Sequence, residues 1–160
     1  MNFQNLLWLF PVAITLHNAE EAIWFPAWSQ RPGRWHAPVA PGVFRFAVAV
    51  LTILAYLIAW QSAVSGKQSV WTYLAFGSMV ATLANALIPH IAVSLATRSY
   101  MPGTVTAAVL NLPALSLLVT LALGEGYVSG WKAVAYSLGV PGIALLSIPA
   151  LFSLGKALNL

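Results

Sequence analysis

Apolar residues dominate five long stretches of the chain, which short polar or Pro/Gly-rich stretches separate. The apolar stretches run from about 3 to 28, 43 to 64, 70 to 97, 102 to 123 and 131 to 158. A helix needs about 20 apolar residues to cross the hydrocarbon core of a bilayer, and each stretch reaches that length. The pattern predicts an all-α fold, a polytopic bundle of about five transmembrane helices. Because 160 residues leave no room for a soluble domain, we expect one integral-membrane domain over residues 1–160.

Prolines indicate where these helices bend or begin. Pro11 predicts a kink in the first helix, and Pro141 and Pro149 predict bends in the last one. Pro102 is expected in the first turn of the fourth helix, where its missing N–H leaves no hydrogen bond unmade.

The composition supports the membrane interpretation and narrows the partners. Hydrophobic residues make up 60% of the chain and charged residues only 6%, whereas about a quarter of a soluble domain is charged. The net charge of +4 does not indicate a nucleic-acid partner, because the seven Lys and Arg residues are scattered singly. The absence of cysteine excludes disulfides, thiolate metal sites and a Cys nucleophile. The partner that the composition predicts is the lipid bilayer.

Basic residues near the helix ends predict the orientation of the bundle. Five fall on one side of it: Arg31, Arg34, Arg45, Arg98 and Lys156. Lys67 and Lys132 fall on the other side. Because positive residues favour the cytoplasmic side, we expect the N-terminus outside and the C-terminus inside. The one long connection, residues 29–42, lies on the basic side, and its His36 is expected to be an ordinary solvated residue.

The first apolar stretch contains three ionisable residues, His17, Glu20 and Glu21. On a helix, residues three and four apart share a face, so both carboxylates lie beside the imidazole. An ionisable group in the hydrocarbon costs about 2.5 kcal/mol or more unless it is paired or hydrated. No Lys or Arg lies within one turn, so the cluster requires partners on another helix, a metal ion or water. We therefore predict a functional site here.

Polar residues of the third and fourth stretches are the predicted partners. Pro89 cannot donate to the carbonyl of Asn85, which is thereby freed, and His90 follows directly. Asn111 places a buried amide in the fourth stretch. Counted from the helix ends at 1.5 Å per residue, Glu21, His90 and Asn111 all lie roughly 10–14 Å from one membrane side. A shared level predicts a single site. Its expected substrate-binding residues are Asn85, Asn111 and Tyr100.

The segment His17-Asn18-Ala19-Glu20-Glu21, near the start of a small hydrophobic chain, resembles the motif of the HXXEE-domain family of small bacterial integral membrane proteins. The later His90 and Tyr100-Met101-Pro102-Gly103 fit the same resemblance, which would cover most of the chain. The resemblance implies a protein of the bacterial cytoplasmic membrane. It implies no established activity, so the function has to be argued from the residues.

A metal site is the first chemistry that the cluster suits. Imidazole and carboxylate ligands favour Zn, Fe or Mn, and a His and a Glu one turn apart form a workable chelate. A ferritin-type di-iron site needs about four carboxylates, whereas this chain has three acidic residues and Glu125 lies at the other side. We expect one divalent ion with an open position, as in catalytic sites. Its candidate ligands are His17, Glu20, Glu21 and His90.

The same four residues also suit acid–base catalysis without any cofactor. Two neighbouring carboxylates in a low dielectric resist double ionisation, so one tends to stay protonated and can donate a proton. Apolar walls favour a small lipophilic substrate such as a terpenoid or another lipid.

Two other functions are also compatible with the cluster. Carboxylate and His relays also line the proton pathways of transporters, but the chain shows no inverted repeat. Five helices are also few for alternating access unless the protein forms a homodimer. A polar network can instead hold helices together in a structural or accessory subunit, a role for which carboxylates are poorly suited. A membrane-embedded enzyme is therefore the favoured hypothesis.

Overall fold

The computed structural model describes residues 2–31 and 37–160, so Arg34 and His36 lie outside the described residues. The described residues are mostly helical and contain no strand. The helices are α1 (Phe3–Leu6), α2 (Leu9–Ser29), α3 (Pro41–Ser65), α4 (Val70–Asn85), η1 (Ala86–Ile91), α5 (Ala92–Thr97), α6 (Thr104–Thr106), η2 (Ala107–Asn111), α7 (Leu112–Gly124) and α8 (Gly130–Ala157). The short π-helical turns η1 and η2 each join the helices on either side of them.

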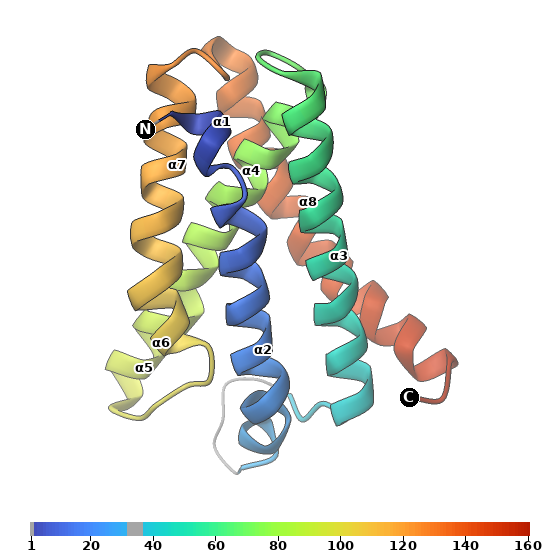
Figure 1. Ribbon diagram of the computed structural model, residues 1–160. Helices are drawn as coiled ribbons and strands as arrows, with labels where there is room; N and C mark the ends of the chain where they lie inside the picture. Colours follow the sequence, from blue (N-terminus) through green and yellow to red (C-terminus); the bar gives the residue numbers. More distant parts are fainter. Residues whose placement is uncertain (1, 32–36) are drawn as a thin grey trace.

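The chain passes five times along the bundle (Figure 1). Helix α2 descends from the N-terminal end, α3 rises, α4–η1–α5 descends, α6–η2–α7 rises and α8 descends, so the two termini lie at opposite ends. Four of these passes are long and apolar enough to cross a membrane: residues 41–65, 70–97, 104–124 and 130–157. With 21 residues, α2 is also long enough, although its middle is polar. The predicted all-α membrane bundle is confirmed.

The kink that Pro11 predicts in the first pass lies at Leu7 and Trp8, because a proline ring crowds the carbonyl four residues earlier, here that of Leu7. Pro102, expected in the first turn of the fourth helix, instead precedes that pass, which begins at Thr104 with Gly103 as its N-cap. In the last pass, α8 continues through both of its prolines and bends away from the bundle in its lower half (Figure 1).

Four of the described basic residues lie at the same end of the bundle. Arg31 follows α2, Arg45 lies near the start of α3, Arg98 follows α5 and Lys156 lies near the end of α8. These helix ends lie together in the lower part of Figure 1. The bundle therefore has one predominantly basic end.

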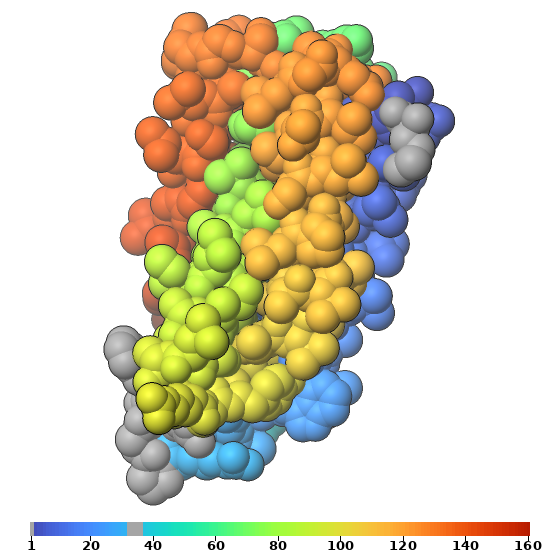
Figure 2. All heavy atoms as spheres, turned by 90° about the vertical axis from the view of Figure 1, so that its left-hand side faces the viewer, coloured from blue at the N-terminus to red at the C-terminus, as the bar shows by residue number. Residues whose placement is uncertain are grey.

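The core consists of two apolar clusters with a polar level between them. One cluster joins α1, α2, α4 and α7 and includes Phe10, Met79 and Leu115. The other lies at the basic end and includes Phe25 and Val93. Along α2 the polar residues 17–21 separate the two clusters. Figure 2 shows the flank of this arrangement, with α6–η2–α7 packed between α4–η1–α5 and α2.

Candidate metal centre

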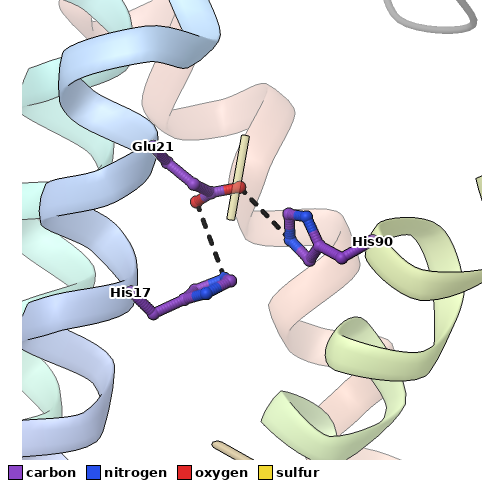
Figure 3. A group of neighbouring side chains, drawn as sticks. All are labelled: His17, Glu21 and His90. Atoms are coloured by element: carbon purple, nitrogen blue, oxygen red, sulfur yellow. Dashed lines mark ion pairs between the residues drawn. The ribbon is translucent and has the colours of Figure 1, made fainter. Parts of the chain in front are cut away.

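Three ionisable side chains converge at the polar level (Figure 3). His17 and Glu21 lie one turn apart on α2, and His90 faces them from η1. The Nε2 atom of His90 is 3.3 Å from Oε1 of Glu21, and Nε2 of His17 is 3.9 Å from Oε2. One ligand atom from each residue lies within 4.8 Å of the others. We call this group the His17–Glu21–His90 triad.

The triad is nearly enclosed. The side chains of His17 and His90 are only 3% and 1% exposed, while that of Glu21 is 13% exposed. The two imidazole rings meet edge to face, with their centroids 4.7 Å apart. Burial on this scale means that the three groups solvate one another or a bound ion rather than bulk water.

Pro89 shapes the turn that carries His90. It has no N–H to continue the helical ladder, and the preceding Ile88 has non-helical angles (φ −133°, ψ 114°). The chain therefore kinks inside η1, and His90 is buried directly after the kink.

Glu20 has a different environment from its neighbour Glu21. Its Oε1 accepts hydrogen bonds from the Gly103 N–H at 2.8 Å and from the Tyr100 hydroxyl. Its Oε2 accepts from the Thr106 N–H at 2.9 Å and from the Thr106 hydroxyl at 2.6 Å. These backbone donors form the start of the α6–η2–α7 helix, where the helix dipole favours a negative charge. Glu20 therefore holds the start of this helix against α2, and neither of its oxygens belongs to the triad.

Thr106 links Glu20 to the triad and determines the tautomer of His17. A hydroxyl has one proton to donate, and the carboxylate of Glu20 is its closest acceptor. His17 Nδ1, 2.9 Å from the same hydroxyl oxygen, must then be the donor of the second bond. The lone pair of His17 consequently lies on Nε2, the atom that faces Glu21 and Asn85.

Gly103 packs directly against both imidazoles. Its φ of +94° favours glycine. A Cβ built on it would lie 2.5 Å from Cε1 of His90 and 3.0 Å from Cε1 of His17. The sequence alone indicates no role for Gly103 or Thr106 in the site. The available signal was the Pro102-Gly103 pair before a helix start, which marks a turn where the backbone approaches another element.

The three expected substrate-binding residues have different positions. Asn85 is exposed, and its Nδ2 lies 3.5 Å from Nε2 of His17. Tyr100 reaches the site through Glu20. Asn111 is fully buried, but neither atom of its amide has a hydrogen-bond partner among the described residues. The structure thus joins Asn85 and Tyr100 to the site by hydrogen bonds and shows no hydrogen bond between Asn111 and the described residues of the site.

Tyr100 lies in the connection between α5 and α6, outside the membrane-spanning segments. Its carbonyl accepts a hydrogen bond from the indole N–H of Trp28 at 3.1 Å, which fixes the connection to α2. Partial burial and the hydrogen bond to Glu20 raise the pKa of Tyr100 to about 12. Its hydroxyl therefore keeps its proton at neutral pH and remains a donor to Glu20.

The triad offers two imidazole nitrogens and a carboxylate to a single ion. This donor set suits Zn, Fe or Mn. The third acidic residue, Glu125, lies at the far end of the bundle, where its two oxygens accept hydrogen bonds from the Phe3 N–H at 3.2 and 3.1 Å. Among the described residues no further cluster could add ligands for a second ion. The arrangement can therefore hold one metal with an open position, or move a proton between Glu21 and an imidazole.

Comparisons with known proteins agree with the motif. The family described as proteins of unknown function with an HXXEE motif matches residues 8–118, a range that includes the whole triad. The chain is also 40% identical to the uncharacterized protein YrkK of Bacillus subtilis over 154 residues, which are 94% of this chain and 95% of that protein. No solved structure matches the chain. These descriptions state no activity.

Proposed function

Since the chain belongs to the HXXEE family, we propose its function from the site: a membrane-embedded enzyme that holds one divalent metal ion at the His17–Glu21–His90 triad and acts on a small lipophilic substrate. The observation that carries this proposal is the convergence of the three ligand atoms within 4.8 Å at a buried level. Three protein ligands leave a coordination position open, which is the arrangement of catalytic rather than structural zinc sites.

The surroundings of the triad support metal ligation. The hydrogen bond from His17 Nδ1 to Thr106 leaves the Nε2 lone pair directed at the triad. Metal-bound histidines in proteins usually have their second ring nitrogen fixed in this way, which sets the tautomer and the ring plane. Glu20 supports Thr106 in turn.

The residues around the triad also define how a substrate would approach. Glu21 retains some exposure, and Asn85 is exposed beside His17 Nε2. This side of the site lies within the membrane-spanning part of the bundle, so a molecule that reaches it comes from the bilayer. Neighbouring Leu87 and Ile88 are 51% and 72% exposed, which suits an apolar substrate such as a terpenoid or another lipid.

A bound metal would supply a Lewis acid or an activated water. The chain itself would hold the ion, exclude bulk water from it and orient the substrate through the Asn85 amide. Without a metal ion, Glu21 would be the residue able to exchange a proton with the substrate, because Glu20 is occupied by four hydrogen bonds. For the membrane we propose the bacterial cytoplasmic membrane, with the basic end of the bundle in the cytoplasm.

Metal analysis of the detergent-purified protein tests the proposal. We expect one Zn, Fe or Mn per chain after growth in metal-supplemented medium, and its loss in His17→Ala, His90→Ala and Glu21→Gln. The matched control is His36→Ala, which removes the one other histidine of the chain. A purified wild-type protein that stays free of metal, and whose thermal unfolding does not respond to added metal, would overturn it.

The rival functions give different results in the same preparations. A transporter predicts substrate or proton flux in proteoliposomes that disappears in Glu21→Gln. A structural or accessory subunit predicts that Glu21→Gln binds its partner and supports growth like the wild type. Metal-free acid–base catalysis predicts turnover of a lipophilic substrate that chelators leave unchanged.

A further inference from the structure

A long groove follows the outer side of α2 beside the start of α6. It consists of two neighbouring hollows of about 460 and 420 Å³, both of which are lined by Trp24 and Tyr100. One hollow is bounded mainly by apolar side chains, among them Leu16, Ile23 and Val105. The other hollow is bounded by Arg31 and Ser99 and by the flank of Trp28. We call the whole feature the α2–α6 groove.

The groove changes from polar to apolar in the same direction as a lipid does. Its polar part lies at the basic end of the bundle, and its apolar part extends toward the middle of the membrane-spanning segments. Glu20 contributes to the inner wall, but it is only 6% exposed and its oxygens are already hydrogen-bonded. The apolar part therefore suits an alkyl chain rather than a polar molecule.

Arg31 at the outer rim has no carboxylate to pair with. The chain contains three acidic residues, of which Glu20 and Glu21 lie at the buried site and Glu125 lies at the opposite end. No described residue forms an ion pair with Arg31. An anionic group at the membrane surface is attracted to such a residue by about 1 kcal/mol.

We propose that the α2–α6 groove binds one anionic phospholipid, with its phosphate at Arg31 and one acyl chain along Trp24 to Leu16. The length of the groove agrees with this occupant. Leu16 and Arg31 are 15 residues apart, which is roughly 22 Å along a helix. One leaflet, including its headgroups, is also about 20–22 Å thick. The bound lipid keeps the depth and direction that it has in the bilayer.

The lipid contacts the side of the site formed by Glu20 and Thr106 and does not contact the triad. Glu20, Tyr100 and Thr106 line the groove on one side, and through Glu20 and Thr106 the same wall supports His17. The lipid is thus separate from the substrate side at Asn85, and its binding does not depend on a metal ion.

Native mass spectrometry of the protein, purified in detergent and stripped of metal with a chelator, tests the inference. We expect phosphatidylglycerol to be retained as one tightly bound molecule, with phosphatidylcholine bound at least about fivefold more weakly, the ratio that 1 kcal/mol corresponds to. Arg31→Gln should abolish this preference. Arg98→Gln is the matched control, because Arg98 lies at the same end but outside the groove.

A second pair of variants tests the apolar part. Val105 and Val109 are 57% and 74% exposed on the same helix, and only Val105 lines the groove. Val105→Trp should fill the groove and remove the bound lipid, whereas Val109→Trp should retain it. The inference fails if both lipids bind equally, if both arginine variants lose the lipid alike, or if a free fatty acid displaces phosphatidylglycerol. Because metal is absent throughout, these results are independent of the proposed enzyme function.

Discussion

The Nδ1 atom of His17 lies 2.9 Å from the hydroxyl oxygen of Thr106, a residue 89 positions later in the chain. This contact joins the motif helix α2 to the start of the α6–η2–α7 helix. Because the Thr106 hydroxyl donates to Glu20, it fixes which nitrogen of His17 carries the proton. Substitutions can separate the residues that would bind the metal from those that position them.

Thr106→Val removes the hydroxyl and keeps the shape of the side chain. His17 then loses the partner of its Nδ1, and we expect metal affinity to fall 10- to 100-fold, the usual effect of losing a residue that orients a ligand. Thr106→Ser restores the hydroxyl and should recover most of the affinity. Competition with a chromophoric chelator measures both. Equal affinities in Thr106→Val and the wild type would show that Thr106 does not orient His17.

Gly103→Ala adds one methyl group between the two imidazoles. A φ of +94° disfavours alanine, and the added Cβ would lie 2.5 Å from Cε1 of His90. We therefore expect a loss of about 1–3 kcal/mol in stability together with the loss of metal binding. Thermal unfolding in detergent measures the loss of stability, and the metal content of the purified protein measures the loss of metal binding. Gly139→Ala is the control, since a Cβ there meets nothing within 4 Å. Its stability should be unchanged or slightly higher. If both alanine variants behave alike, the packing of Gly103 on the rings is not tight.

The two neighbouring glutamates should respond differently to the same substitution. Glu20→Gln weakens the charge-assisted hydrogen bonds from Gly103 and Thr106, each worth about 1.5–3 kcal/mol, and should lower the unfolding temperature of the metal-free protein. Glu21→Gln removes no such bond and should mainly abolish metal binding. Measuring both properties in both variants checks the assignment. The reverse pattern would make Glu20 the metal ligand.

Tyr100 should ionise near pH 12 rather than near pH 10. Its raised pKa means that the native state keeps a proton that the unfolded state has already released. The stability that this provides is therefore fully present below about pH 10 and is lost as the pH rises toward 12. The absorbance of tyrosinate, as the difference between the wild type and Tyr100→Phe, isolates this group among five tyrosines. A difference titration centred at pH 10 would contradict the hydrogen bond to Glu20.

Several features of the protein could be predicted from the sequence because they depend on local or one-dimensional rules. The thickness of the bilayer sets the length that an apolar spanning helix needs, so the five apolar stretches predict the all-α membrane bundle. The helical repeat places Glu21 one turn after His17, and counting residues from the helix ends places His90 at the same level. In the structure, Nε2 of His90 lies 3.3 Å from Oε1 of Glu21.

The separate roles of Glu20 and Glu21 were decided only by the tertiary structure. Adjacent residues on a helix point about 100° apart, so each meets whatever packs on its own side. Here α6 packs on the side of Glu20, and η1 lies opposite Glu21. The same dependence on packing explains why Gly103 and Thr106 were not foreseen and why Asn111, at the right depth, has no hydrogen bond to the triad. Chain length and periodicity specify the depth of a side chain in the membrane, whereas the rotation and packing of the helices specify its partners.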